Sequence, residues 1–248
     1  MEYLLNNFPK IIVPSWVIPG TYLENLRFLD DKKEITGVEL LFFIYDDEIK
    51  KNITDEFEDI CKFKDRFIFT AHLPDVLNPE HEELVKKLSP LVQHFIVHPG
   101  KEGGARAQAG LINSWAEKYK NVSSKYRFLA ENTNPGLLEA LLPNLNTNIG
   151  LCMDFGHLLI EEKNPSAYLN QFQNKIGEIH LHGLDREKAM IDKRLPDHRP
   201  INEDSIPIKE LFPLLKKFQG LVNLEVFSWE EVEESLRVIK LLLERKEK

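Results

Sequence analysis

Residues 126–154, YRFLAENTNPGLLEALLPNLNTNIGLCMD, contain the pattern that determines the fold. The stretch begins with an apolar run at 126–131 and ends with another at 148–154. The last residues of these runs are Glu131 and Asp154. Between them, residues 135–142 open with a proline and carry leucines at helical spacing. Two short apolar runs joined by a helix predict two parallel strands connected by a helical crossover.

The same alternation of short apolar runs and amphipathic stretches continues along the whole chain. The other six predicted strands are residues 11–17, 35–43, 67–72, 95–98, 176–182 and 221–227. Further helical patterns include residues 79–92, 107–119, 208–218 and 229–245. Eight strand and helix pairs without a Gly/Ser linker predict an α/β protein with a single (β/α)8 TIM barrel domain over residues 1–248. An open doubly wound sheet is the structural alternative, but no GxGxxG motif follows the first strand.

Composition limits the classes of partner. The chain is 42% hydrophobic and 29% charged, which is ordinary for a globular protein, and its net charge of −8 offers no overall basic field for nucleic acid or an anionic membrane. No apolar run reaches the ~20 residues that span a bilayer. The two cysteines, Cys61 and Cys152, form neither a disulfide framework nor a cysteine zinc site. Residues 1–20 carry acidic Glu2 and polar Asn6 in place of the basic and apolar regions of a signal peptide. We therefore expect a cytoplasmic protein.

Histidines and acids gather at one end of the predicted strands. Six of the eight histidines fall at or just beyond the carboxyl ends of strands, where barrel enzymes build their active sites. Three acids end strands in the same way, and alternation along each strand allows all of these side chains to point inward. The histidines are His72, His98, His157, His180, His182 and His198, and the acids are Glu131, Asp154 and Glu225.

This concentration of ligand types predicts a metal centre. Any one of these residues alone is more often a core histidine or a helix cap, but so many imidazoles and carboxylates at one rim are costly to bury without a cation. The set exceeds what one ion coordinates, so we expect two or three divalent ions, with zinc favoured by the imidazoles and manganese allowed by the carboxylates. We expect His81 and His94 to be structural, Glu39 to make a polar contact inside the barrel, and Cys152 to pack beneath the metals.

The ligand series resembles that of the xylose isomerase-like barrels, the AP endonuclease family 2 superfamily, in the fuller version of the endonuclease IV-type phosphodiesterases. Several local strings are similar to the cobamide-remodelling phosphodiesterase branch, CbiR. The series is His72, His98, Glu131, Asp154, His157, His180, Asp197, His198 and Glu225, and the strings are VELLFF (38–43), EN (131–132), MDFGHL (153–158), IHLHG (179–183), DHR (197–199) and LEVFS (224–228).

The resemblance implies metal-assisted hydrolysis of a phosphodiester in the nucleotide loop of a corrinoid. In that arrangement Glu131 bridges two ions, His72 and His98 hold one, and His180 and Glu225 hold another together with Asp154. A third ion would take His157, Asp197 and His198. The chain departs from endonuclease IV at this third position, since Asp197 and His198 are adjacent and Asn202-Glu203-Asp204 replaces the glycines expected there. His180 and His182 compete for one ligand position; we expect His180 to be the ligand and His182 to contact substrate or a ligand.

Signals for the substrate are weaker. Lys101 and Arg106, in a glycine-rich segment after the fourth strand, and Arg199 beside His198 could hold a phosphate, although a flexible turn and surface charge explain them equally well. Apolar side chains such as Trp16, Phe43 and Phe227 follow strands one, two and eight and could face a large ligand or simply cap the core.

The sequence-based hypothesis is therefore a phosphodiesterase with a small-molecule substrate, a corrinoid or a sugar phosphate. The main alternative is a metal-dependent sugar or sugar-phosphate isomerase or epimerase, in which Glu131 and Glu225 act as acid and base and only one metal is needed. Counting metals per chain separates these two. An abasic-site endonuclease would have to bind duplex DNA, which the charge does not favour. A non-catalytic corrinoid or metal carrier would bind metal without turnover.

Overall fold

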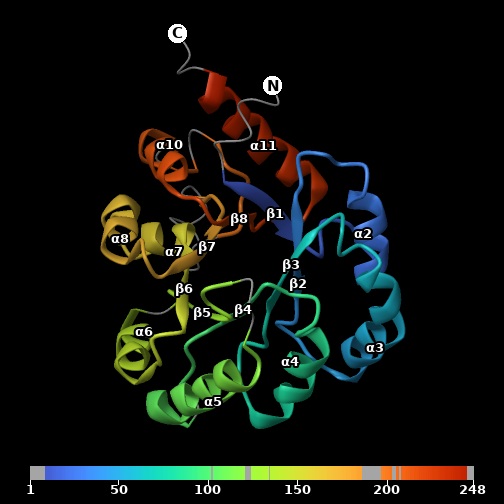
Figure 1. The fold of residues 1–248 in the computed structure, drawn as a ribbon. Coiled ribbons are helices and arrows are strands. Elements are labelled where there is room, and N and C mark those ends of the chain that lie inside the picture. The colour runs from blue at the N-terminus through green and yellow to red at the C-terminus, as the bar shows by residue number, and fades with distance from the viewer. Residues whose placement is uncertain are drawn as a thin grey trace.

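The protein, described by a computed structural model, is a closed barrel of eight parallel strands in chain order, with β1 paired to both β2 and β8 (Figure 1). The structure describes residues 9–101, 103–120, 124–133, 135–185, 197–202, 205–206 and 208–244. The single α/β barrel expected from the sequence is confirmed. The strands are β1 Lys10–Pro14, β2 Gly37–Leu41, β3 Ile68–His72, β4 His94–Val97, β5 Phe128–Glu131, β6 Gly150–Asp154, β7 Ile176–Leu181 and β8 Leu221–Leu224.

Helices surround the barrel and follow the strands in sequence (Figure 1). Side chains at their N-termini explain where several begin: Asp46 accepts a hydrogen bond from Ile49 N at the start of α3, and Asn164 accepts one from Ala167 N at the start of α8. Their bounds are α2 Tyr22–Leu29, α3 Asp47–Cys61, η1 Pro79–His81, α4 Glu82–Leu88, α5 Gly104–Lys118, α6 Pro135–Leu141, η2 Leu142–Asn144, α7 Phe155–Ile160, α8 Pro165–Phe172, α10 Ile208–Lys217 and α11 Trp229–Glu244.

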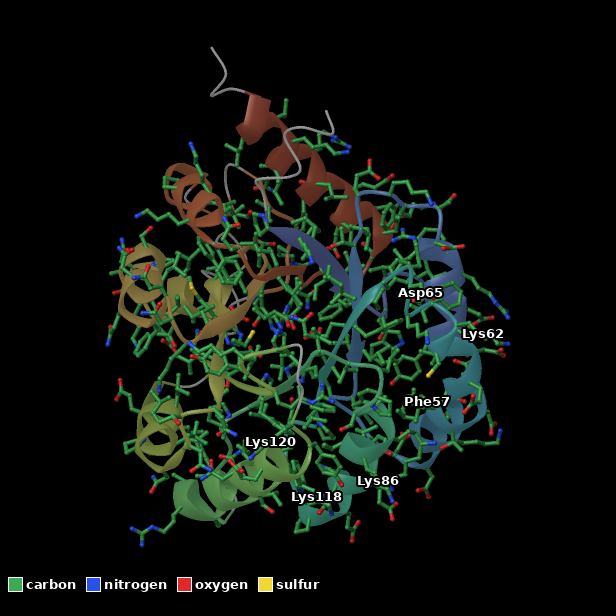
Figure 2. All side chains as sticks on the ribbon, viewed as in Figure 1. Phe57, Lys62, Asp65, Lys86, Lys118 and Lys120 are labelled. Atoms are coloured by element: carbon green, nitrogen blue, oxygen red, sulfur yellow. The ribbon has the colours of Figure 1, made fainter. Side chains whose placement is uncertain are left out.

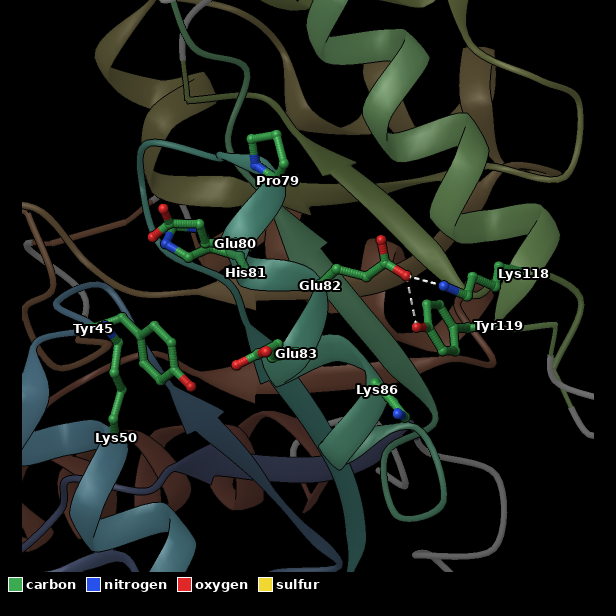
Figure 3. A pocket seen from close by; sticks show the side chains of 10 residues that line it. All are labelled: Tyr45, Lys50, Pro79, Glu80, His81, Glu82, Glu83, Lys86, Lys118 and Tyr119. Atoms are coloured by element: carbon green, nitrogen blue, oxygen red, sulfur yellow. Dashed lines mark hydrogen bonds and ion pairs between the residues drawn. The ribbon is translucent and has the colours of Figure 1, made fainter.

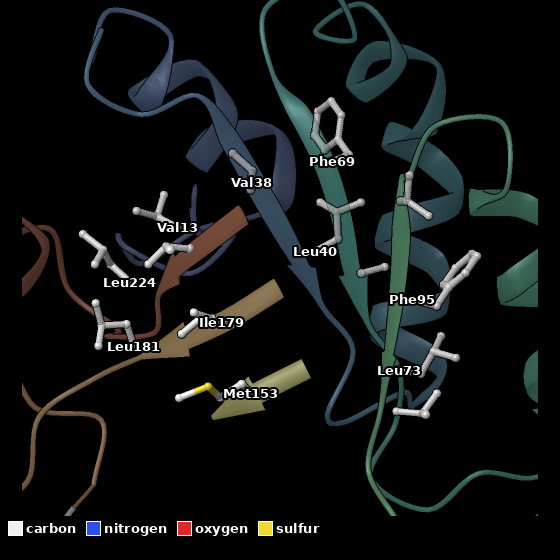
Figure 4. Close-up of a cluster of buried hydrophobic side chains, with 14 of the residues drawn as sticks. Val13, Val38, Leu40, Phe69, Leu73, Phe95, Met153, Ile179, Leu181 and Leu224 are labelled. Carbon is white, nitrogen blue, oxygen red and sulfur yellow. The ribbon is translucent and has the colours of Figure 1, made fainter. Parts of the chain in front are cut away.

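The main hydrophobic core lies between the outer face of the barrel and the helices. Alternate strand residues such as Val38, Phe69 and Ile179 point outward into it and are buried (Figure 4). Charged side chains such as Lys62, directly after α3, and Lys86, in α4, are exposed on the outside of the barrel (Figure 2). Within the described residues, no helix has the length and apolar character needed to cross a bilayer.

The inside of the barrel is layered. A small apolar cluster of Ile96, Tyr126, Leu129 and Cys152 is buried in it, and Cys152 Sγ also lies within 4.8 Å of potential ligand atoms of Glu131 and His180. His94, expected to be structural, hydrogen-bonds to the carbonyl of Tyr126 through Nδ1 at 2.7 Å. Polar and charged strand side chains, among them Thr70, Glu178 and Asn223, are also fully buried.

Candidate metal centre

The predicted ligands meet at the carboxyl end of the barrel. His72, Glu131 and Asp154 are the last residues of β3, β5 and β6, and His98 directly follows β4. His180 lies one residue before the end of β7. Because parallel strands all end at the same rim, residues spread over more than 100 positions of sequence come together.

Glu131 is at the centre of the cluster and is almost completely buried. Its Oε2 lies 3.3 Å from His72 Nε2, 3.4 Å from His98 Nε2 and 3.4 Å from His180 Nδ1. Two ligand atoms that each lie about 2.0–2.1 Å from a tetrahedral zinc are separated by about 3.3 Å. These distances fit ligand atoms that share an ion, and they also fit hydrogen bonds and ion pairs between the same groups.

The His72 and His98 rings are oriented by hydrogen bonds on their far sides. His72 Nδ1 donates to the carbonyl of Leu73 at 2.9 Å, and His98 Nδ1 lies 2.9 Å from Asp75 Oδ1. Each ring thus presents Nε2 to Glu131, an arrangement typical of metal-bound histidines. Sequence analysis missed Asp75, which stands three residues after His72 in the loop that follows β3 and could have been recognised from that position.

His180 and Glu225 form a second group around Glu131. His180 Nδ1 lies 3.2 Å from Glu225 Oε2, and neither atom has a hydrogen-bond partner although both are buried. Buried polar atoms without partners are unfavourable. A divalent cation between Glu131, His180 and Glu225 would satisfy them, so this donor set fits a metal.

A third group lies around Asp154. Its carboxylate caps α7 by accepting from His157 N at 2.6 Å and lies 3.2 Å from His182 Nε2. His157 Nε2 is 3.7 Å from Asp197 Oδ2, and the backbone N–H of His198, at a φ of 50°, donates to His182 Nδ1 at 3.0 Å. Asp154 is therefore both a helix cap and a candidate ligand.

His180 and His182 do not compete for one position, contrary to the sequence-based interpretation. Both rings are fully buried, but His180 faces Glu131 and Glu225, whereas His182 faces Asp154. Gly156, in α7, makes room for His182: a Cβ on this glycine would lie 2.0 Å from His182 Cε1. The IHLHG and MDFGHL strings are thus partly explained by the contact between Gly156 and His182.

The electrostatics of the cluster are complementary. Burial alone would raise the pKa of Glu131, but the neighbouring His180, His98 and His72 hold it well below its usual range. Burial opposes protonation of His98 and His157, yet nearby carboxylates raise the pKa of His98 to about 10 and of His157 to about 9. Protons on the imidazoles balance the carboxylate charge, and a bound divalent cation would supply that positive charge instead.

No side-chain contact described in the structure joins the predicted substrate-binding cations to this cluster. Lys101 and Arg106 are exposed, and no contact described in the structure joins them to the histidines. Arg199 is half exposed and lies 3.9 Å from Glu231 Oε1. Among the expected apolar side chains, Phe43 packs against His72 with ring centroids 4.3 Å apart, and Phe227 packs against His198 at 5.1 Å. Trp16 is 45% exposed.

A separate groove of about 660 Å³ lies on the flank of the barrel, beside α3, α4 and the end of α5 (Figure 3). Tyr45, His81 and Glu83 line it, whereas none of the candidate ligands does. His81 Nε2 accepts a hydrogen bond from Asn78 Nδ2 at 3.2 Å, in keeping with the structural role expected for it.

Comparison with known proteins supports the fold. The profile of a family described as "Xylose isomerase-like TIM barrel" matches residues 90–242. A D-tagatose 3-epimerase-like protein is 19% identical, with a TM-score of 0.68 over 95% of this chain and 97% of the other. L-ribulose 3-epimerase is 14% identical, with a TM-score of 0.67 over 96% and 95%. The IOLI protein, solved with a bound zinc atom, is 14% identical, with a TM-score of 0.64 over 95% and 98%. No curated protein matches the sequence.

The expected phosphodiesterase activity on a corrinoid is wrong. The structural neighbours include sugar epimerases, a sugar phosphate isomerase/epimerase and a probable 3-DHS dehydratase, and nothing found supports phosphodiester hydrolysis. The error has a physical reason: imidazole and carboxylate ligands specify a divalent cation, and both classes of reaction use one. The ligand series therefore indicated the ion and could not indicate the bond that reacts.

Proposed function

Because the chain belongs to the xylose isomerase-like TIM barrel family, we propose that it is a divalent-metal-dependent isomerase or epimerase of a small sugar or sugar phosphate. The observation that carries this proposal is the approach of two glutamates to one imidazole nitrogen. Glu131 from β5 and Glu225 after β8 lie 3.4 Å and 3.2 Å from His180 Nδ1, and both carboxylates are buried.

Four side chains would hold the cation: Glu131, Asp154, His180 and Glu225. When bound, the ion would polarise a substrate carbonyl and so acidify the neighbouring C–H bond. Zinc suits the imidazole and manganese suits the three carboxylates. The reaction needs one ion; the two or three ions expected from the number of ligands stay a prediction.

The two glutamates would move the proton. One ionised carboxylate removes a proton from the carbon next to the carbonyl, and the other returns a proton to the substrate, so that no proton is gained or lost overall. Proton exchange with solvent between turnovers would restore the starting protonation of the two glutamates. His182 and His157, on the Asp154 side of the cluster, would hydrogen-bond substrate hydroxyl groups.

The test is proton exchange in heavy water. Purified protein, stripped of metal and reloaded with zinc or manganese, is incubated with ketoses and ketose phosphates in D2O, and deuterium at the reacting carbon is followed by NMR. We expect metal-dependent exchange accompanied by a product isomer. Glu131→Gln and Glu225→Gln should each reduce turnover by about 10²–10⁴-fold, the usual contribution of a positioned acid or base.

A matched control is Glu34→Gln, which removes a surface carboxylate paired with Lys240 at 2.9 Å and should leave turnover unchanged. Absence of both exchange and isomer with every substrate and metal would refute the proposal. So would a folded, metal-loaded Glu131→Gln variant that keeps most of its activity.

A further inference from the structure

A buried polar layer lies inside the barrel directly beneath the candidate metal centre. Glu39, Thr70, Glu178 and Asn223 come from four different strands and are fully buried. Asn223 Nδ2 donates to Glu39 Oε1 at 2.8 Å, and Thr70 Oγ1 donates to Glu178 Oε1 at 3.3 Å. Burying a carboxylate is costly unless it is hydrogen-bonded, so Glu39 needs a further partner for its second oxygen.

That partner is His180. Its Nε2 lies 3.2 Å from Glu39 Oε2, whereas Glu178 Oε1 is farther away, at 3.8 Å. The opposite ring nitrogen, Nδ1, faces Glu131 and Glu225. One imidazole therefore connects the buried layer to the rim.

The hydrogen-bonding capacity of the Glu39 carboxylate and the His180 imidazole decides the tautomer of His180. An ionised carboxylate only accepts hydrogen bonds, and a neutral imidazole carries one N–H. If Nε2 carries the N–H and donates it to Glu39, the lone pair is on Nδ1, where the unpartnered Glu225 Oε2 also points. A carboxylate on the far nitrogen of a histidine ligand orients the ring and increases its basicity.

We propose that Glu39 is a positioning residue, which accepts a hydrogen bond from His180 Nε2–H and thereby presents His180 Nδ1 as the ligand of the divalent cation. Asn223 holds the other carboxylate oxygen and so fixes Glu39 itself. The inference rests on the cation of the proposed function but not on the reaction that it supports. It gives a role to a charged side chain that lies in the barrel interior and does not reach the rim.

Three variants of the full-length chain separate positioning from general stability. Glu39→Leu removes the acceptor, Glu39→Gln keeps an acceptor oxygen, and Thr70→Val alters the same layer at a side chain that contacts Glu178. The zinc dissociation constant of each is measured by competition with a chromophoric chelator, and folding is checked by circular dichroism. We expect about 10–100-fold weaker binding for Glu39→Leu, most of the affinity restored in Glu39→Gln, and wild-type affinity for Thr70→Val.

A second measurement needs no variant. Long-range ¹H–¹⁵N correlation spectra of the zinc-loaded wild-type protein report which nitrogen of His180 is protonated and which binds zinc. We expect protonated Nε2 and zinc-bound Nδ1. This measurement decides the question if Glu39→Leu does not fold.

Any one of these results would overturn the inference: zinc bound through His180 Nε2, unchanged zinc affinity in folded Glu39→Leu, or an equal loss of affinity in Thr70→Val. A chain that binds no zinc would also refute it. Zinc binding through Nδ1 without turnover of any sugar would keep the role of Glu39 and reject the isomerase. Turnover of a sugar, together with unaltered zinc affinity in Glu39→Leu, would support the isomerase and reject the role of Glu39.

Discussion

Asn132 holds the backbone of Asp154 through both of its amide atoms. Its Nδ2 donates to the Asp154 carbonyl at 3.0 Å, and its Oδ1 accepts from the Asp154 amide at 2.8 Å. Both residues are buried. Because Asn132 directly follows Glu131, this pair of hydrogen bonds ties the end of β5 to the end of β6 and so couples two candidate ligands.

Asn132→Ala should therefore destabilise the protein. The substitution leaves two buried backbone groups of Asp154 without partners, which should lower the free energy of unfolding by about 2–4 kcal/mol. Urea denaturation measures this loss. The control is Asn164→Ala, which removes the exposed N-cap of α8 and should cost about 1 kcal/mol. Equal losses in the two variants would show that the Asn132 hydrogen bonds contribute no more to the free energy of unfolding than an exposed helix cap does.

Two glycines in helices should respond in opposite ways to alanine. Gly156→Ala would place a Cβ 2.0 Å from His182, so we expect a loss of about 1–3 kcal/mol as the ring is displaced. In α5, a Cβ on Gly110 has no neighbour within 4 Å, and Gly110→Ala should stabilise the protein by about 0.5–1 kcal/mol. Thermal denaturation compares them. A Gly156→Ala variant as stable as wild type would contradict the packing described.

His94 should make the stability depend on pH. Burial, aided by Arg127, lowers the pKa of His94 to about 4 from the ordinary 6.5. Between these values the unfolded chain binds a proton and the folded chain does not, so this contribution is complete above pH 6.5 and is lost as the pH falls. The shift corresponds to about 3 kcal/mol at pH 4.

Denaturation of the wild type and of His94→Asn across pH 4–7 tests this expectation. The variant should show a shallower fall in stability, because it has no proton to bind at this site. Parallel curves for the two proteins would mean that other groups cause the acid sensitivity. His94 is suited to the test because its neighbours include the carbonyl of Tyr126 and the amide of Gln93 and none of the candidate ligands.

Metal content should exceed one ion per chain. The ligand atoms of His72, His98 and Glu131 lie within 4.8 Å of one another, in addition to the group around His180. Elemental analysis of zinc-saturated protein should give at least two equivalents, and His98→Ala should remove one of them. A single equivalent in both proteins would restrict binding to one ion, whose presence should still stabilise the fold by about 2.7 kcal/mol at a hundredfold excess over its dissociation constant.

The sequence by itself determined the barrel and its rim. Local periodicity distinguishes strands from helices, and the regular alternation of the two leaves few topologies in which each apolar face is buried. Residues such as His72, Glu131 and Asp154 end their strands, so the shared direction of parallel strands was enough to bring them to one edge. Glu39 was also correctly assigned to the barrel interior.

Only the tertiary structure decided which atoms face one another. The separation of His180 from His182, the Asp75 partner of His98 and the contact between Glu39 and His180 all depend on the barrel's closure and on side-chain rotamers, which join residues as many as 141 positions apart. Sequence analysis also predicted the wrong reaction, because the types of ligand determine which ion is bound but do not determine which bond reacts. The bond that reacts depends on where acid and base groups lie around the substrate, and that arrangement is set by packing in three dimensions.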